Sequence, residues 1–314
     1  MMALRSLGLA LALTAGAASA AHAAPASPTA PDPRATGFYR LQLGDFRITV
    51  LSDGAAPRDL PAIMSDPETA RTAFAHAKVA LPVEVSINCF LVDTGTRRLL
   101  IDTGAGELFG PTSGGQLVAH LRAAGYAPEM IDAVLLTHIH ADHSGGLTVA
   151  GQRVFPNATV YVDAADPALW LDPVNEAAAP EARKATFQQS RRTVGPYVAA
   201  GKVETFHAPA ALFPGVRAVA LRGHTPGHVG YMIESRGQRL LLWGDTIHAS
   251  QVQFKHPDIT IAYDVDALGA AQTRRNILAD AAHGGYLVGG AHITFPGLGH
   301  VDRQGDHFRW RQLR

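Results

Sequence analysis

The chain contains Thr137-His138-Ile139-His140-Ala141-Asp142-His143, in which four side chains that commonly bind metal ions lie within six residues. An apolar run, Ile131 to Thr137, precedes the histidines and predicts a buried strand. Residues two apart in an extended segment point the same way, so His138 and His140 can reach one metal ion together. We expect the chain to turn into a helix beyond them, with Asp142 and His143 facing a second ion. Imidazoles and carboxylates are ligands that zinc prefers.

Three further ligand candidates follow apolar runs later in the chain. His224 stands in Gly223-His224-Thr225-Pro226-Gly227-His228, Asp245 follows Leu242-Trp243-Gly244, and His292 follows Gly290-Ala291. A single histidine after a strand is more often a structural residue than a ligand. None of the three identifies a metal site by itself.

Length and composition limit the classes of function. The chain has 314 residues, of which 47% are hydrophobic and 17% charged. A sizeable core is therefore expected, in one large domain or two small ones. Lysine plus arginine and aspartate plus glutamate both number 27, which gives no basic surface for nucleic acid and argues against a polybasic membrane-surface protein.

The first residues are typical of an exported protein. Residues 1–23 predict a secretory signal peptide, with Arg5, a short apolar stretch at 7–18 and the cleavage site Ala21-His22-Ala23. An uncleaved membrane anchor is the alternative. Cleavage would leave a periplasmic or secreted protein without a membrane segment, beginning with a flexible leader at 24–36. The single cysteine, Cys89, allows no internal disulfide and is expected to be buried.

The hydrophobic pattern predicts many strands separated by helices. Two hairpins are expected, 38–43 with 46–51 and 88–93 with 98–102. Further strands are expected at 131–137, in two short runs within 154–162, and at 216–221, 229–235, 239–243 and 286–291. Helices are expected at 116–124 and 267–282, and a proline-interrupted helical segment at 166–200 is a candidate cap over a site. Two packed sheets with helices outside fit this order, and other α/β arrangements stay open at this point.

The ligand pattern resembles that of the metallo-β-lactamase superfamily. The order His138-x-His140-x-Asp142-His143, then His224, Asp245 and His292, carries this resemblance. It implies a single αββα sandwich domain over residues 37–314, with metal ions at the strand ends. Within the superfamily the chain resembles the methyl parathion hydrolase group and its lactonase relatives. Matching stretches lie at Gly37–Arg40, Leu51–Gly54, Asp102–Gly104, Leu108–Thr112, His224–His228 and Phe295–His300.

The resemblance implies a role for each ligand. His138, His140 and His224 would hold one ion, Asp142, His143 and His292 the other, and Asp245 would bridge both. The implied cofactors are two divalent ions per chain, with zinc expected and manganese or cobalt as alternatives. Hydroxide attack on a small-molecule ester would follow, with Asp142 and Asp245 as the catalytic carboxylates. Asp102 is expected to orient a ligand histidine, or else to be a turn residue before Gly104. The resemblance also implies a homodimer.

Five residues are expected to shape the substrate pocket. Phe109, Trp170 and Phe187 match aromatic positions at the pocket mouth of the methyl parathion hydrolase group, and core packing is their alternative role. His248 and Tyr263 replace small or aliphatic residues of that group, so we expect a narrower, more polar pocket. Lactones and aryl esters should then be preferred, with phosphotriesters as weak substrates. An organophosphate hydrolase is the alternative. His228, His300 and His307 are read as structural or surface residues.

Other functions remain open on the sequence. A true β-lactamase lacks an aspartate that bridges both ions, and a glyoxalase II-like thioesterase adds a C-terminal helical domain, whereas 22 residues follow His292 here. A nuclease of this fold would require a basic face. A non-catalytic periplasmic metal- or ligand-binding protein and a mononuclear iron oxygenase are further alternatives, and metal analysis separates the last from a two-zinc enzyme.

Overall fold

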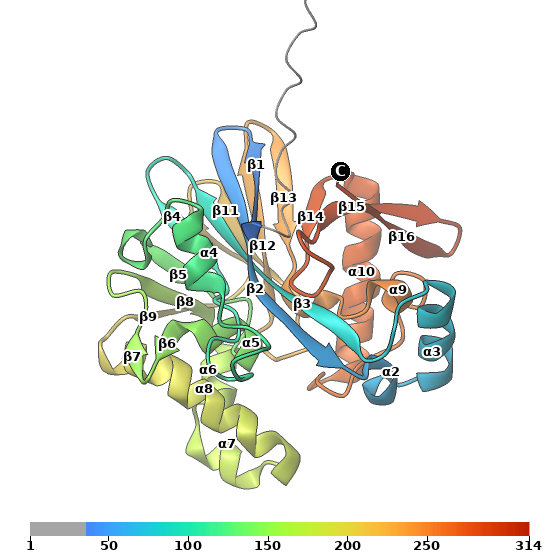
Figure 1. Ribbon diagram of the computed structural model, residues 1–314, viewed down its shortest axis with the longest axis horizontal. Coiled ribbons are helices and arrows are strands. Elements are labelled where there is room, and N and C mark those ends of the chain that lie inside the picture. The colour runs from blue at the N-terminus through green and yellow to red at the C-terminus, as the bar shows by residue number, and fades with distance from the viewer. Residues whose placement is uncertain (1–35, 314) are drawn as a thin grey trace, which may run out of the picture. The chain divides into compact units, whose positions relative to one another are not determined.

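The computed structural model describes residues 36–313 (Figure 1). The predicted signal peptide, and the predicted leader except for its last residue, lie outside the described residues. Within the described part, no helix has both the length and the apolar character needed to cross a membrane.

Two seven-stranded sheets form the centre of the molecule. One sheet contains, in spatial order, β1 (Phe38–Leu43), β2 (Phe46–Arg58), β3 (Val83–Asp93), β4 (Arg98–Ile101), β5 (Ala133–Leu135), β8 (Thr159–Asp163) and β9 (Val203–Phe206). Its first four strands pair antiparallel, and the pairs from β4 to β9 are parallel.

The second sheet is antiparallel apart from one pair. It contains, in spatial order, β10 (Ala210–Phe213), β11 (Val216–Ala220), β12 (Val229–Ser235), β13 (Gln238–Leu242), β14 (Leu287–Gly289), β15 (Leu298–Gln304) and β16 (His307–Gln312). β13 and β14 are the parallel pair. A separate small hairpin joins β6 (Thr148–Val149) to β7 (Gln152–Arg153).

Helices cover the outer faces of the two sheets (Figure 1). The α-helices are α2 (Leu60–Ile63), α3 (Pro67–His76), α4 (Leu117–Ala123), α5 (Ala141–Ser144), α6 (Ala165–Trp170), α7 (Pro173–Ala178), α8 (Glu181–Ala199), α9 (Ser250–Gln253) and α10 (Ala267–Gly284). α4 contacts β2 of the first sheet, and α10 contacts β15 of the second. The predicted 116–124 and 267–282 helices are confirmed as α4 and α10.

The core has the layers expected of an αββα sandwich. Phe90 and Val92 of β3 pack with Tyr231 of β12 between the two sheets. Leu91, which lies between them in sequence, points to the opposite face of β3 and joins the core beneath α4 and α8, as the period of two in a strand requires. Leu278 of α10 packs on the outer face of the second sheet. The predicted fold class is confirmed.

The expected hairpins are present, but β2 and β3 are longer than predicted. β2 and β3 pair from Arg47 with Asp93 to Arg58 with Val83, with a shift in register between Ser52 and Gly54. The prediction of two strands within 154–162 is wrong, because only β8 forms there and residues 154–158 lie outside any strand. The 166–200 segment is helical as expected, in three pieces, α6, α7 and α8.

Candidate metal centre

The seven predicted ligands lie in segments that follow strand ends. His138 and His140 follow β5, and α5 carries Asp142 and His143. His224 lies between β11 and β12, while Asp245 lies in the turn after β13 and His292 follows β14. Because β13 and β14 are parallel neighbours, their carboxyl ends meet at one edge of the sheet. The fold therefore brings ligand candidates as far apart in sequence as His138 and His292, 154 positions, into one cluster.

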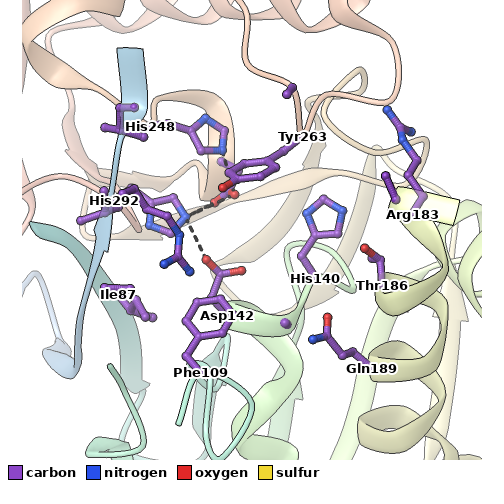
Figure 2. A pocket seen from close by; sticks show the side chains of 18 of the residues that line it. Ile87, Phe109, His140, Asp142, Arg183, Thr186, Gln189, His248, Tyr263 and His292 are labelled. Atoms are coloured by element: carbon purple, nitrogen blue, oxygen red, sulfur yellow. Dashed lines mark hydrogen bonds and ion pairs between the residues drawn. The ribbon is translucent and has the colours of Figure 1, made fainter. Parts of the chain in front are cut away.

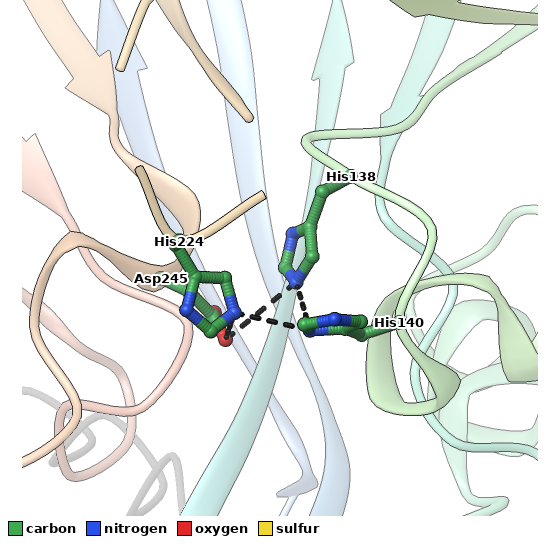
Figure 3. A group of neighbouring side chains, drawn as sticks. All are labelled: His138, His140, His224 and Asp245. Carbon is green, nitrogen blue, oxygen red and sulfur yellow. Dashed lines mark hydrogen bonds and ion pairs between the residues drawn. The ribbon is translucent and has the colours of Figure 1, made fainter. Parts of the chain in front are cut away.

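One group of four ligand candidates is built around His140 (Figure 3). Nδ1 of His140 lies 3.0 Å from Nε2 of His138 and 3.0 Å from Nε2 of His224. Oδ2 of Asp245 lies 3.2 Å from Nε2 of His224 and 3.7 Å from Nε2 of His138. A tetrahedral zinc ion with bonds of 2.0–2.1 Å holds its ligand atoms about 3.3 Å apart. The group therefore has the dimensions of a zinc site.

A second group contains Asp142, His143 and His292. Oδ1 of Asp142 lies 3.8 Å from Nε2 of His143, and Oδ2 of Asp142 lies 3.6 Å from Nε2 of His292 (Figure 2). Asp245 reaches this group through its other oxygen, because its Oδ1 lies 2.9 Å from His143 Nε2 and 3.1 Å from His292 Nε2. Each oxygen of Asp245 thus faces one of the groups, and Oδ2 also lies 3.3 Å from Nε2 of His292.

Two buried atoms at the contact between the groups lie 2.9 Å apart but form no hydrogen bond in the described part of the chain. They are Nε2 of His143 and Oδ1 of Asp245. A buried polar atom without a partner costs free energy, and native proteins rarely leave one without an ion, a water or another group to bind it. The convergence of imidazole nitrogens and carboxylate oxygens fits divalent metal ions with this donor set.

Burial and the neighbouring charges set the protonation of the cluster. Burial holds the pKa of His138 and of His140 well below the usual range, so both rings are neutral and ready to bind a metal. Burial would raise the pKa of Asp245, but the surrounding histidines, His143 first, hold it well below its usual range. Burial lowers the pKa of His224, but hydrogen bonds to Asp245 and Asp264 raise it to about 9. A metal must displace that proton.

Three ligand histidines also contact a hydrogen-bond acceptor through the ring nitrogen that faces away from the cluster. His143 Nδ1 lies 2.8 Å from Oδ2 of Asp102, His224 Nδ1 lies 2.9 Å from Oδ1 of Asp264, and His292 Nδ1 lies 2.9 Å from the carbonyl oxygen of Ser86. Such contacts fix the tautomer and the orientation of a ligand ring.

Asp102 was singled out from the sequence, whereas Asp264 and Ser86 were not. Asp102 also accepts hydrogen bonds from the backbone N–H and the hydroxyl of Thr137, and its φ is 57°. It therefore occupies a left-handed turn before Gly104 and also holds a ligand histidine, so the two expected roles coincide. Asp264 and Ser86 lie in no motif, and nothing in their local sequence distinguishes them.

Two more buried residues connect the ligand segments. His228 contacts the carbonyl oxygen of Leu221 through Nδ1, at 2.7 Å, and its Nε2 accepts the backbone N–H of Asp245, at 3.0 Å. Asp166 of α6 accepts the backbone N–H groups of Ile139 and Gly227, at 2.7 and 2.8 Å. The structural reading of His228 is confirmed, and Asp166 joins the segments that carry His138 and His224.

Sequence and structure comparisons now place the chain among known proteins. A family model described as the Metallo-beta-lactamase superfamily matches residues 82–292. The chain belongs to this superfamily. No curated protein sequence matches it significantly.

Solved structures of the same superfamily cover most of the chain. The hydrolase AbOPH, described as a member of the beta lactamase superfamily, is 34% identical with a TM-score of 0.84, and the match covers 88% of this chain and 98% of that one. AidC, a dizinc quorum-quenching lactonase, is 26% identical with a TM-score of 0.82 and the same coverage. A probable metal-dependent hydrolase from Staphylococcus aureus is 23% identical with a TM-score of 0.72, over 87% and 100% of the two chains, and shows the fold alone.

A pocket opens on the candidate metal centre (Figure 2). Its floor carries His140, Asp142, Asp245, His248 and His292. One side, the apolar wall, consists of Ala56, Leu60, Val85, Ile87 and Phe109. The opposite side, the polar wall, consists of Arg183, Thr186 and Gln189 of α8. The three residues of the polar wall are three apart in sequence and therefore share one face of the helix.

Four of the five predicted pocket residues line this pocket, and the prediction for Phe187 is wrong. Phe109, Trp170, His248 and Tyr263 are lining residues. Phe187 is only 3% exposed and packs behind Trp170, with ring centroids 4.9 Å apart. Its neighbour Thr186 faces the pocket, so the helical turn directs Phe187 into the core.

His248 and Tyr263 differ in burial. His248 is 4% exposed and its Nε2 lies 3.1 Å from Oδ2 of Asp245, so it touches the metal centre as well as the pocket. Tyr263 is 43% exposed at the rim. Burial of its hydroxyl raises the pKa of Tyr263, and the charge of nearby Arg58 opposes that rise. His248 thus belongs to the floor and Tyr263 to the mouth.

Proposed function

We propose that the chain is a dinuclear metal-dependent hydrolase of lactones and aryl esters. The observation that carries the proposal is the placement of Asp245, whose two oxygens face two separate groups of ligand candidates. Membership of a superfamily of metallo-hydrolases and the similarity to a dizinc lactonase support it.

The residues would divide between two ions as the resemblance implies. His138, His140 and His224 would hold one, Asp142, His143 and His292 the other, and Asp245 both. Zinc is the expected metal, with manganese or cobalt as alternatives. When bound, the ions would supply a nucleophilic hydroxide near neutral pH and polarise the carbonyl oxygen under attack.

The protein side chains would bind and orient the substrate above this centre. Phe109 and Trp170 offer flat apolar surfaces for an aryl or acyl group. The side chain of Asp142 is 21% exposed, against 4% for that of Asp245, and lines the pocket. Asp142 is therefore placed to take a proton from the attacking water and to return it to the leaving oxygen.

Pocket shape supports carbonyl substrates over phosphotriesters. A phosphotriester requires room for two alkoxy groups and a leaving group around tetrahedral phosphorus, whereas an ester carbonyl is flat. His248 occupies the floor beside Asp245, and Tyr263 occupies the rim. The narrower resemblance to methyl parathion hydrolase keeps organophosphate hydrolysis as the competing proposal.

A substrate comparison tests the proposal. We expect the metal-loaded protein to hydrolyse dihydrocoumarin and an acyl-homoserine lactone with a higher kcat/KM than methyl parathion, and a β-lactam least of all. A higher kcat/KM for methyl parathion would instead show that the protein is an organophosphate hydrolase. Bound metal without hydrolysis of any ester would instead indicate the non-catalytic binding protein.

Two further proposals rest on the sequence and the resemblance. We propose that the chain is exported with cleavage before Ala24, which N-terminal sequencing of the protein from its native host tests. We also propose a homodimer, which the mass of the protein in solution tests. A retained Met1, or a monomeric mass, would contradict the respective proposal.

A further inference from the structure

Two arginines without acidic partners line the pocket of the metal centre. Arg58 lies at the end of β2 and Arg183 lies on α8, and both are half-buried. Neither guanidinium has a carboxylate within 4.0 Å in the described part of the chain. The carboxylate nearest to Arg58 in sequence, Asp59, lies 3.9 Å from Arg71 instead.

The contrast within α8 shows that Arg183 is a special case. The helix carries four cationic side chains, and three of them contact a glutamate: Lys184 pairs with Glu181, Arg191 with Glu176 and Arg192 with Glu107. Arg183 is the fourth, and it is the one that lines the pocket. The cation of this helix without an acidic partner is thus the cation that a ligand can reach.

Both guanidiniums are held in place but keep donors free. Arg183 donates from Nη2 to the carbonyl oxygen of Asp264, at 3.1 Å, and Arg58 donates from Nη1 to that of Pro57, at 3.0 Å. The guanidinium of Arg58 also stacks on Phe109, with its Cζ 4.8 Å from the ring centroid. A guanidinium has five N–H donors in a planar fork that matches a carboxylate, so several donors remain for a ligand.

We infer that this pocket selects esters and lactones that carry a carboxylate remote from the bond that is cleaved, and that Arg58 and Arg183, on two sides of the pocket, provide the cationic groups that recognise it. The inference rests on the proposed ester hydrolase function. Phe109 provides the apolar surface beside Arg58 that an aryl or acyl body would cover, while the metal centre on the floor engages the ester group. The two arginines are specificity-determining residues.

A matched pair of esters tests the inference. The probes are 4-carboxyphenyl acetate and its neutral counterpart, 4-carbamoylphenyl acetate. We expect Arg58→Gln and Arg183→Gln each to lower kcat/KM for the carboxylate ester roughly tenfold, the size of one lost charge-assisted hydrogen bond, and to spare the amide ester. The ratio of the two values, compared between enzymes, cancels the intrinsic reactivity of the esters. Salt should lower the wild-type ratio.

Lys184→Gln is the control variant. It removes one positive charge from the same helix, but Lys184 pairs with Glu181 and does not line the pocket. It should leave the ratio unchanged. An equal loss in Lys184→Gln would show that only the net charge matters and would overturn the inference.

The remaining outcomes separate this inference from the proposed function. If the ratio of kcat/KM for the two esters is the same in wild type and in all the variants, the proposed carboxylate subsite is wrong, while the proposed hydrolase function is unaffected. If neither ester is cleaved, the binding of 4-hydroxybenzoate and 4-hydroxybenzamide decides. Weaker binding of the acid alone in the two arginine variants supports the subsite, and unchanged binding overturns it.

Discussion

Nε2 of His248 lies 3.1 Å from Oδ2 of Asp245, the oxygen that also faces His224. The ring of His248 is buried and its Nδ1 has no hydrogen-bond partner among the described residues. His248 thus affects both the shape of the pocket and the carboxylate proposed to bridge two ions. Replacing it should change which substrates fit, and this separates ester from phosphotriester chemistry.

His248→Leu should shift the preference toward phosphotriesters. Leucine removes a polar ring from the pocket floor, and a gained contact or relieved clash changes kcat/KM by roughly 10–200-fold. The measurement is the ratio of kcat/KM for methyl parathion to that for dihydrocoumarin. His207→Leu, at an exposed histidine outside the pocket, serves as the control. An unchanged ratio in His248→Leu would show that pocket shape does not set the preference.

The ligand candidates could be located in the sequence because each segment that carries them follows an apolar run, and the resemblance to the metallo-β-lactamase superfamily joined them into one set. A buried strand has a continuous hydrophobic signal, and its end at the sheet edge is where polar side chains can meet. His138, Asp245 and His292 all stand in such places. The partners of the ligands carry no such signal. Asp264 is an isolated aspartate in a loop, and Ser86 contributes only a backbone carbonyl oxygen.

Two of the strands that the sequence analysis did not predict, β15 and β16, lack the apolar signal as well. β15 and β16 form one end of the second sheet and carry charged side chains on an exposed face, including Asp302, Arg309 and Arg311. In such strands apolar and polar residues alternate only weakly, so their sequences resemble those of loops. α2 is a single short turn with proline near its start, too short for a helical period to be seen. Tertiary pairing, rather than local preference, defines these elements.

Removal of metal should abolish hydrolysis. Dialysis against a strong chelator should give an inactive protein, and zinc, cobalt or manganese should restore activity. Elemental analysis of the active protein should give two ions per chain, because the seven predicted ligands form two groups that share Asp245. Full activity in a verified metal-free sample would contradict the proposed function, and one iron per chain would favour the oxygenase alternative.

Asp245→Ala should disturb both ions at once. Its two oxygens face different groups, so the variant loses one ligand at each ion. We expect metal content below one ion per chain and a loss of at least about 3 kcal/mol in transition-state stabilisation, the size of one lost electrostatic contact. The measurements are metal content and kcat/KM on the same sample. Two retained ions with near-normal kcat would exclude a bridging role.

The two carboxylates behind the ligand rings should act on different ions. Asp264 contacts His224, and Asp102 contacts His143. Asp264→Asn and Asp102→Asn should therefore each lower the affinity for one ion roughly 10–100-fold. Asparagine tolerates the left-handed backbone at position 102. Metal content at a fixed low concentration of free zinc should fall from two ions toward one in each variant. Asp258→Asn, at an exposed carboxylate, is the control.

Asp166 gives a prediction on pH and stability. Burial raises the pKa of its carboxyl to about 6, although Thr225 and the backbone N–H groups of Ile139 and Gly227 oppose the rise. In the unfolded chain the pKa of this carboxyl is near 3.8, so the folded protein binds the proton more tightly than the unfolded chain does. The stabilising contribution is complete below pH 3.8 and is lost as the pH rises through about 6.

Asp166→Asn isolates this contribution, because asparagine keeps the shape and does not titrate. Its amide oxygen can accept one of the two backbone N–H groups, and its NH₂ group faces the other, so the variant should be less stable than wild type. The difference in the free energy of unfolding should be larger at about pH 5 than at about pH 8. Urea denaturation of both proteins at the two pH values measures it. A difference that is constant, or that grows with pH, would mean that Asp166 is ionised throughout and that its two accepted hydrogen bonds outweigh the cost of burial.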